Sequence, residues 1–511
     1  MAEQLINALL IHPSDNTVTL LKDVSLGEKI TFRRNQEIVS IESKKDIPFG
    51  HKAAIKNISK GEPVVKYGEV IGLAVNDIFP GNHVHVDNLE STRGRGDVDV
   101  AIDPSKNEDR ETRNETESTG KDFSDRTFLG YPRKDGSVGT RNYIAVVSCV
   151  VCANEVARFA SESPNVAVFT HQQGCSQTMP DVQQVKKVLV NLAKNPNVAA
   201  TVFVSLGCES VPSSEVARLA AESGKPAEVV IIQKEGGSSQ AIQKCREIIK
   251  KFEKELEKVK PQRFPISKLK LGLKCGSSDT TQGLSANVIA GRITDMFVRS
   301  GASVIIGETT EFMGAEHIAA KHAVNEEVGK AIKERVLAME NRAKAVGVDM
   351  RGGQPTRGNI QGGLTTIEEK SLGALAKAGT SIFQEVVDYG SIPSKTGLVM
   401  MDSPGREPEM LSGLAAAGCN IVLFTTGRGA PQGFPFIPVV KITGNENTWK
   451  FMGEHMDFCV SGVMTGEETI DSAAGRVFEF MLDVCSGTKR TVAEVKGYND
   501  SMNIYVQGPV I

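Results

Sequence analysis

The 511-residue sequence predicts an α/β body with mainly parallel sheets, preceded by a small all-β domain. Two observations predict this fold. Over residues 1–90, short apolar segments are separated by glycine, proline and asparagine, which is typical of strands joined by turns. From about residue 127, apolar strand-like runs alternate with helix-like stretches, which favours parallel α/β architecture.

The composition limits the class of protein. Hydrophobic residues make up 40% and charged residues 24%, as in ordinary globular proteins. The net charge is −3 and no basic block occurs, so we expect no nucleic-acid partner. No apolar run approaches the roughly 18 residues that a membrane-spanning helix needs, and the first residues do not resemble a signal peptide. We therefore expect a cytoplasmic protein that does not bind membranes.

The N-terminal domain is expected over residues 1–90, and a polar, highly charged linker over residues 91–126. The body is expected as two α/β lobes, residues 127–308 and 309–511. The division is placed there because residues 309–395 carry few strand signals. The strands expected in the body are 143–151, 198–207, 227–233, 268–276, 302–309, 396–402 and 419–427, and the longer helices are 181–195, 239–259 and 325–346.

Polar or glycine-rich segments follow six apolar, strand-like runs, five of them among the strands above and the sixth the run "AVF" at residues 167–169. Ligands of open parallel sheets gather at the carboxyl ends of the strands, so six such segments indicate a shared crevice, whereas one alone would be ordinary turn chemistry. These segments are residues 170–177, 208–210, 275–283, 308–317, 402–407 and 425–433.

The side chains in these segments suit a small, oxygen-rich, anionic substrate such as a sugar acid. Arginine can bind a carboxylate through two hydrogen bonds. Hydroxyl groups add further hydrogen bonds, and carboxylates are available for proton transfer or metal binding. The candidate substrate-binding residues are Arg428, Arg406, Thr426 and Asp279, with Glu308, Glu311 and Asp402 as further carboxylates.

Cysteine and histidine side chains in the same segments suggest a metal site. Thiolate and imidazole ligands suit Fe²⁺ or Zn²⁺, although packing at the strand ends is an alternative role for each cysteine. Cys149 and Cys152 form a CxxC pair without other signs of redox function. The candidate ligands come from separate loops and are His171, Cys175, Cys208 and Cys275.

The N-terminal domain carries a His-x-His pair, His83 and His85, which would share one face of a strand. Such a pair can bind a metal or transfer protons. The alternative is a solvated strand face without chemistry. His51 lies in a second glycine- and lysine-containing stretch of the same domain.

Several motifs together resemble the altronate and galactarate dehydratase family over nearly the full length. Residues 47–72 and the stretch "GNHVHVDN" resemble the SAF domain of that family, which implies a β-clip fold for the N-terminal domain. The body carries "THQQGCSQ", "LGCES", "LKCGSSD" and "LFTTGRGAP".

The resemblance implies a hydro-lyase that converts a sugar acid into a 2-keto-3-deoxy acid and depends on a divalent metal. Fe²⁺ is the expected ion, and Mn²⁺ or another divalent ion is the alternative. It implies that Arg428 holds a substrate carboxylate and that Glu308 joins the histidine and cysteines at the metal. His51, His83, His85 and His171 are the expected catalytic histidines. The expected binding partner is then a small sugar acid as substrate. A homo-oligomer of the chain is a further possibility.

Two stretches depart from the family pattern. Ser277 stands where the sugar-acid dehydratases typically have a glycine, and residues 352–363 differ from the usual loop. Both are closer to sulfolactate sulfo-lyase, which eliminates sulfite from a hydroxy acid. The residues favour altronate, then galactarate. A lyase on another hydroxy acid such as sulfolactate and a non-catalytic sugar-acid binding protein are the alternatives.

Overall fold

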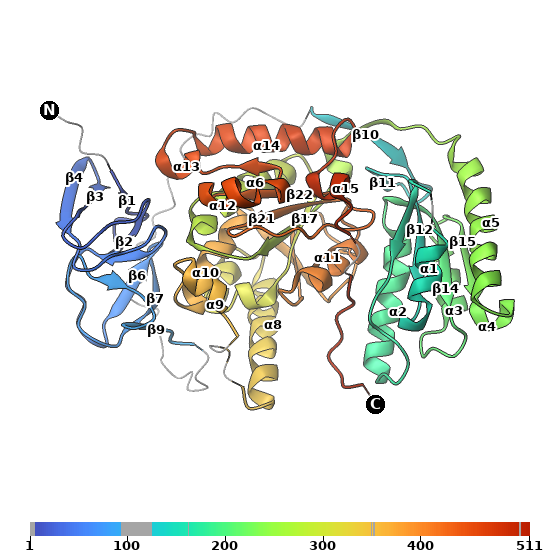
Figure 1. Cartoon of the computed structure of the whole chain (residues 1–511), viewed down its shortest axis with the longest axis horizontal. Coiled ribbons are helices and arrows are strands. Elements are labelled where there is room, and N and C mark those ends of the chain that lie inside the picture. The colour runs from blue at the N-terminus through green and yellow to red at the C-terminus, as the bar shows by residue number, and fades with distance from the viewer. Residues whose placement is uncertain are drawn as a thin grey trace. The chain divides into compact units, whose positions relative to one another are not determined.

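The computed structural model of the chain forms two compact units (Figure 1). It describes residues 6–93, 125–161, 163–348, 350, 353–499 and 502–510. Unit 1 comprises Met1–Asp125 and Leu337–Leu372, and unit 2 comprises Arg126–Val336 and Gly373–Ile511. Most of the predicted linker lies outside the described residues.

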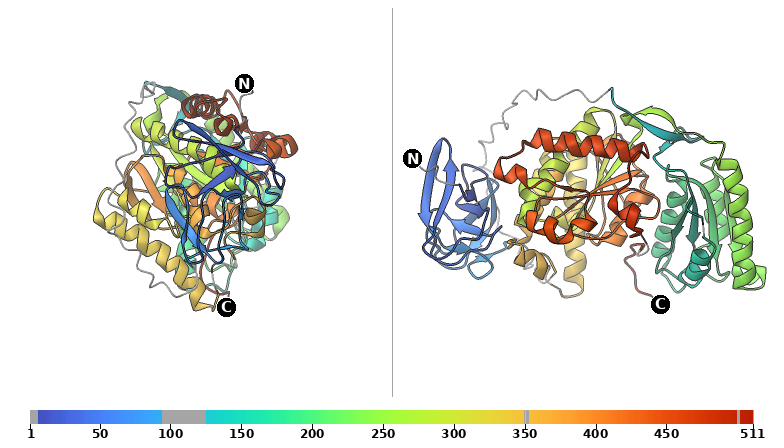
Figure 2. Two further views of the ribbon diagram at one scale, coloured as in Figure 1. Left: turned by 90° about the vertical axis from the view of Figure 1, so that its left-hand side faces the viewer. Right: turned by 45° about the horizontal axis from the view of Figure 1, so that its top comes forward.

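Unit 1 is built from short antiparallel strands, as the sequence of residues 1–90 predicts (Figure 2). Two hydrophobic clusters form its core, one around Val18, Leu20 and Phe32 and the other around Val64 and Ile71. The strands form three sheets: β1 (Ala8–Leu9), β2 (Thr17–Leu20), β5 (Lys52–Ala54) and β8 (His83–Val84); β3 (Lys29–Arg34) and β4 (Glu37–Glu42); and β6 (Pro63–Lys66), β7 (Glu69–Ala74) and β9 (Leu89–Glu90).

Unit 1 also contains a segment from the second half of the chain. This segment, residues 337–372, includes helix α9 (Arg357–Gln361) and most of α10 (Ile367–Leu375). The Thr366 hydroxyl donates a hydrogen bond to the Ile71 carbonyl at 2.6 Å, and Leu372 packs against the second hydrophobic cluster. The sequence placed these residues in the C-terminal lobe; their contacts with the strands instead group them with the N-terminal domain.

The first sheet of unit 2 is parallel and four-stranded, in the order β13-β12-β14-β15 (Figure 1). Helices α2 and α3 contact each other, as do α1 and α5. Its elements are β12 (Tyr143–Ser148), β13 (Val166–Phe169), β14 (Val198–Ser205), β15 (Ala227–Ile231), α1 (Asn154–Phe159), α2 (Met179–Lys194), α3 (Ser213–Ala221) and α5 (Ser238–Leu256).

The second sheet of unit 2 is parallel and seven-stranded, in the order β19-β20-β18-β17-β21-β22-β23. Helix α6 (Asn287–Arg299) packs against α14 (Ile470–Cys485), and α11 (Glu407–Ala416) packs against α2, so one hydrophobic core joins the two sheets. The strands are β17 (Lys270–Gly276), β18 (Ser303–Ile306), β19 (Phe383–Val387), β20 (Gly397–Met401), β21 (Ile421–Thr426), β22 (Val439–Thr443) and β23 (Phe458–Cys459).

The boundary between the two parallel sheets differs from the one expected at residues 308/309. β17 pairs with β21 and β18 pairs with β20, so residues 270–306 belong to the second sheet. Strand pairing between distant segments sets this boundary, and spacing along the sequence does not reveal it. Unit 2 also contains a small antiparallel sheet, which consists of β10 (Thr127–Pro132), β11 (Val138–Gly139) and β16 (Gln262–Pro265).

The described helices include none that is both long enough and apolar enough to cross a membrane.

Candidate active site

The carboxyl ends of β17 and β21 lie side by side where the chain leaves the sheet in opposite directions. β17 leads through α6 to β18 on one side, and β21 leads to β22 on the other. Open parallel sheets bind their ligands at such switch points. The loops that follow these strands, residues 277–282 and 427–433, are two of the polar segments that the sequence singled out.

These two loops are joined by hydrogen bonds. The Arg428 backbone N–H donates to the Ser277 carbonyl at 3.0 Å, and the Gln282 amide donates to the Thr425 hydroxyl at 3.3 Å. The Arg428 side chain is exposed. The switch point therefore presents a guanidinium group at the surface, where it can meet a carboxylate.

Asp279 and Thr426 hold the shape of the same loops. Asp279 is buried and accepts hydrogen bonds from the Thr281 hydroxyl at 2.6 Å and from the Asn445 amide at 2.8 Å. Burial raises the pKa of Asp279, and these hydrogen bonds oppose that shift. Thr426 accepts from the Gly429 N–H at 2.9 Å. Both stay predictions as substrate contacts, and in the structure their hydrogen bonds support the loops.

Gly427 is required by the same packing. A Cβ atom there would lie 2.4 Å from the Asp279 carboxyl carbon, closer than real Cβ contacts allow. The other predicted arginine, Arg406, precedes α11 and forms an ion pair with Glu409 one turn later. Arg406 stays a prediction as a substrate contact.

Cys275 is buried at the end of β17 among polar groups. Its sulfur lies 3.4 Å from the Ser278 hydroxyl and accepts from the Gln282 amide at 3.2 Å. Its backbone N–H donates to Glu308 Oε2 at 2.8 Å. Burial, followed by the Glu311 charge, raises the pKa of the Cys275 thiol, so the neutral thiol predominates near neutral pH.

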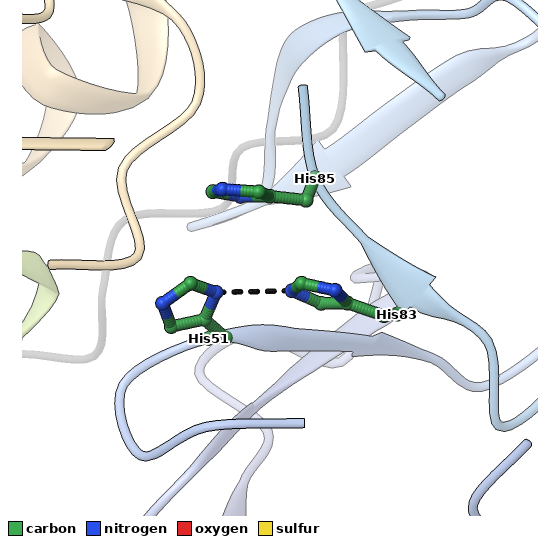
Figure 3. A group of neighbouring side chains, drawn as sticks. All are labelled: His51, His83 and His85. Carbon is green, nitrogen blue, oxygen red and sulfur yellow. Dashed lines mark hydrogen bonds between the residues drawn. The ribbon is translucent and has the colours of Figure 1, made fainter. Parts of the chain in front are cut away.

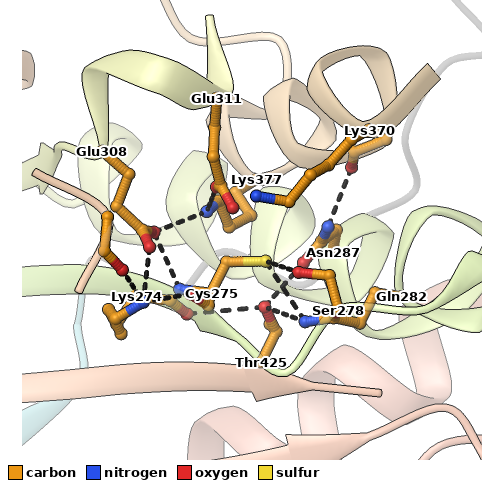
Figure 4. Close-up of polar contacts among 12 residues, drawn as sticks. Lys274, Cys275, Ser278, Gln282, Asn287, Glu308, Glu311, Lys370, Lys377 and Thr425 are labelled. Carbon is orange, nitrogen blue, oxygen red and sulfur yellow. Dashed lines mark hydrogen bonds and ion pairs between the residues drawn. The ribbon is translucent and has the colours of Figure 1, made fainter. Parts of the chain in front are cut away.

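A buried ion cluster surrounds the backbone of Cys275 (Figure 4). It consists of Lys274, Lys377, Glu308 and Glu311, all nearly inaccessible to solvent. Glu308 accepts from Lys274 at 2.5 Å and from Lys377 at 3.1 Å, and Glu311 accepts from Lys377 at 2.8 Å. Two ammonium and two carboxylate groups balance, which permits charges at this depth.

The charges in the cluster keep Lys377 protonated. Burial lowers the pKa of Lys377, but the acidic groups around it, Glu308 and Glu311 among them, raise it, and the net shift is upward. Lys274 is shifted in the same direction, with burial opposed by the charge of Glu308.

The backbone beside the cluster is strained at two positions. Ser277 has φ of 48° and Glu308 has φ of 65°, in the left-handed region that side chains other than glycine rarely adopt. Such conformations cost on the order of 1–3 kcal/mol each, and they concentrate at active sites. Here they flank Cys275 from two different strands.

The predicted cysteine-histidine metal set does not assemble. His171 is buried, its Nε2 lies 2.8 Å from the Ser148 carbonyl, and its Nδ1 accepts from the Gln173 N–H. Both ring nitrogens are thus used to shape the loop. Cys175 and Cys208 are exposed and follow strands of the four-stranded sheet, whereas Cys275 is buried in the seven-stranded sheet. These hydrogen bonds engage both nitrogens of His171 in the structure, and its roles as a metal ligand and as a catalytic base stay predictions.

Three histidines meet in unit 1 instead (Figure 3). The ligand atoms of His51, His83 and His85 all lie within 4.8 Å of one another, and in the part of the chain that is described they form the one such group of His, Cys, Asp or Glu. The His83 and His85 rings are stacked with centroids 5.0 Å apart. Burial lowers the pKa of His83 to about 3 and of His85 to about 4, with neighbouring charges contributing, so both are neutral near pH 7.

The residues that fit a divalent metal are therefore these imidazoles. Neutral imidazole suits Fe²⁺ and Zn²⁺. Glu308, by contrast, is already engaged in the buried ion cluster, and the Cys275 sulfur contacts Ser278 and Gln282. These histidines belong to unit 1 and the switch point belongs to unit 2, and the expectation that the histidines act on a substrate there stays a prediction.

Sequence reasoning missed Lys274 and Lys377. Lys274 lies in an otherwise apolar strand, and a lysine at such a position requires a buried partner; that signal was available. Lys377 lies in a short helical turn, Ala376–Ala378, and nothing near it in the sequence marks it.

Comparison with known proteins matches three family models along the chain. The model described as "D-galactarate/Altronate dehydratase, C-terminal" matches residues 266–509, and "D-galactarate dehydratase/Altronate hydrolase, second domain" matches residues 130–257. The "Altronate/galactarate dehydratase SAF domain" matches residues 6–92.

Individual proteins are similar over most of the chain. An altronate dehydratase of Bacillus subtilis (strain 168) is 34% identical over 492 residues, which cover 93% of this chain and 94% of that protein. A galactarate dehydratase (L-threo-forming) of Escherichia coli (strain K12) is 30% identical over 98% of this chain and 97% of its own length. A (2R)-sulfolactate sulfo-lyase subunit beta of Chromohalobacter salexigens is 35% identical over 383 residues, 73% of this chain and 96% of that protein.

Proposed function

Because the chain belongs to the D-galactarate/altronate dehydratase family, we propose that it removes water from a hexonic or hexaric sugar acid. The enzyme is a carbon-oxygen lyase. Altronate is the favoured substrate and galactarate the next, and the product is a 2-keto-3-deoxy acid.

The observation that carries this proposal is the buried ion cluster beside Cys275 at the switch point of the seven-stranded sheet. Dehydration begins with loss of the weakly acidic proton on the carbon next to a carboxylate. Fixed positive charge near that carboxylate stabilises the enediolate that results. The exposed Arg428 supplies such a charge in the loop bonded to Ser277.

The cluster also offers a way to free a base. Lys377 is shared between Glu308 and Glu311. Because the cluster is buried, a substrate reaches it only when the surrounding loops move, and its carboxylate then competes with both for the Lys377 ammonium. The carboxylate that loses its partner is then free to accept the proton from the substrate, and the same group can return a proton to the departing hydroxyl.

Metal dependence is part of the proposal. A divalent ion, for which Fe²⁺ is the favoured candidate, would act as a Lewis acid and stabilise the enediolate and the leaving hydroxyl.

Sulfite elimination from sulfolactate is the second candidate. The similarity to the sulfo-lyase beta subunit supports it, as does a sulfo-lyase alpha subunit that is 34% identical over 88 residues of this chain. Ser277 also supports this candidate, because the sequence at that position is closer to the sulfo-lyase than to the sugar-acid dehydratases. The two reactions share the first step, removal of the proton next to the carboxylate, and differ in whether hydroxide or sulfite leaves the neighbouring carbon.

The test is anaerobic turnover with added Fe²⁺ on altronate, galactarate and sulfolactate in parallel. The proposal expects a 2-keto-3-deoxy acid from one sugar acid, with loss of activity after treatment with chelator and recovery on adding metal. Sulfite release from sulfolactate would establish the second candidate. If chelator left the activity unchanged, the reaction would not depend on a metal. If folded, metal-loaded protein turned over none of the three substrates, the proposed function would be wrong.

A further inference from the structure

We propose that His51, His83 and His85 form a complete three-imidazole site for a divalent transition metal within unit 1. Binding of the ion does not depend on the substrate; only the use of the ion in the reaction rests on the proposed function.

The spacing of the nitrogens fits a shared ion. His51 Nδ1 lies 3.0 Å from His83 Nε2, and the ligand atoms of all three residues are within 4.8 Å of one another (Figure 3). Two imidazole nitrogens bound to one ion at about 2.1 Å lie about 3.0–3.4 Å apart for bond angles between 90° and 109°. The first pair already has this separation, and the His85 ligand atom lies within 4.8 Å of both.

His85 supplies an independent reason for a ligand. Its Nδ1 is buried and has no hydrogen-bond partner among the described residues. A buried polar atom without a partner costs about 1–3 kcal/mol. A metal ion bound by His85 through Nδ1 would supply the missing partner.

The backbone around the site is fixed by hydrogen bonds. Pairing of β5 with β8 places Ala53 opposite His83, and His51 lies just before β5. The His85 N–H donates to the Asn88 side chain at 3.0 Å, and the Asn88 amide donates to the His83 carbonyl at 2.8 Å. The three rings are therefore positioned before any ion arrives.

The outer contact of His51 is typical of a metal ligand. Its Nε2 lies 3.3 Å from the Gln361 carbonyl, which can only accept a hydrogen bond. Nε2 must then carry the proton, and Nδ1 presents its lone pair toward His83. Metal-binding histidines usually donate their second ring N–H in this way.

The lysines near the site are already paired with a carboxylate. Lys52 and Lys66 both form ion pairs with the buried Glu369. Neutral imidazole is the form that binds metal. Three nitrogen ligands favour Fe²⁺, Co²⁺ or Zn²⁺ over Ca²⁺ and Mg²⁺, which prefer oxygen.

The experiment uses the full chain, stripped of metal with chelator and titrated anaerobically with Co²⁺ and with Fe²⁺. We expect one equivalent of metal per chain, a ligand-field spectrum for Co²⁺, and X-ray absorption at the metal edge with imidazole scattering. His83→Ala and His85→Ala are expected to weaken binding by more than about 100-fold. His12→Ala is the matched control, because His12 is an exposed histidine of the same unit.

Each outcome decides between supporting and overturning the site. Failure of the unaltered chain to bind either ion, or unchanged binding in both histidine variants, would overturn it, and so would absorption data without imidazole. If a variant does not fold, as judged by circular dichroism, the absorption data on the unaltered chain decide. If the three histidines bind metal but the protein turns over none of the substrates, the proposed function is wrong and the metal site is still supported.

Discussion

Lys52 Nζ and Glu369 Oε2 lie 2.9 Å apart with both side chains fully buried, although they are far apart in the chain. Lys66 pairs with the other oxygen of the same carboxylate at 2.7 Å. The three side chains fasten the segment 337–372 to the strands of unit 1. Because Gln361 belongs to that segment and accepts from His51, the ion pairs also support the histidine site.

Replacing Glu369 with glutamine should destabilise unit 1 strongly. The change leaves two buried lysines without a counter-charge, and removing one partner of a buried pair costs about 3–5 kcal/mol. Urea unfolding followed by circular dichroism measures this. Glu334→Gln is the matched control, since Glu334 forms an exposed pair with Lys330 and should change stability by less than about 0.5 kcal/mol. Equal effects of the two substitutions would contradict the buried arrangement.

Cysteine alkylation should separate the three cysteines that the sequence grouped. In native protein, iodoacetamide should modify Cys175 and Cys208, which are exposed, and spare Cys275. Cys275 is both buried and held as a neutral thiol by its raised pKa, so little reactive thiolate forms until pH rises well above neutral. Peptide mapping by mass spectrometry gives the answer, and denatured protein serves as the control in which all three react. Rapid modification of Cys275 in folded protein would be inconsistent with the site described above.

Arg428→Ala should raise KM for the acid substrate about 10- to 100-fold. This corresponds to losing a charge-assisted hydrogen bond worth about 1.5–3 kcal/mol. The exposed side chain contributes little to folding, so the melting temperature should not change. Arg218→Ala provides the comparison, because Arg218 is an exposed arginine paired with Glu222 on α3. If Arg428→Ala had the kinetics of Arg218→Ala, Arg428 would not bind substrate.

Ser277→Gly should stabilise the chain slightly, by up to about 1 kcal/mol. Glycine adopts the left-handed conformation of residue 277 without strain, although its greater freedom in the unfolded chain offsets part of the gain. Asn35→Gly, at φ of 56° in unit 1, tests the same effect away from the site. Thermal unfolding and turnover should be measured on both. A loss of stability in Ser277→Gly would show that the serine side chain outweighs the strain.

Local patterns predicted the strands of the N-terminal domain and most strands of the body, because alternation and turn residues act over short distances. The same rule placed Arg428 and Cys275 at strand ends, where the structure confirms them. It also gave His83 and His85 a shared location, which the stacked rings confirm.

Local sequence patterns did not predict which distant segments of the chain pair with each other. His51 meets His83 because β5 pairs with β8, and Glu369 meets Lys52 across more than half of the chain. His171 shows a second limit: its position after a strand resembles that of a ligand, and the pattern does not reveal the two backbone groups that bond to its ring. Only the folded chain shows which polar groups are already paired.

The most direct test of the central claim is turnover of the preferred acid in D₂O, with the product analysed by NMR. Loss of the proton next to the carboxylate and departure of the neighbouring group give an enol, which takes one proton from solvent as it becomes the keto acid. We predict one deuterium on the carbon that lost the leaving group, whether hydroxide or sulfite departs. Product without deuterium at that carbon would mean that hydrogen moves within the substrate, and it would contradict the elimination proposed for this site.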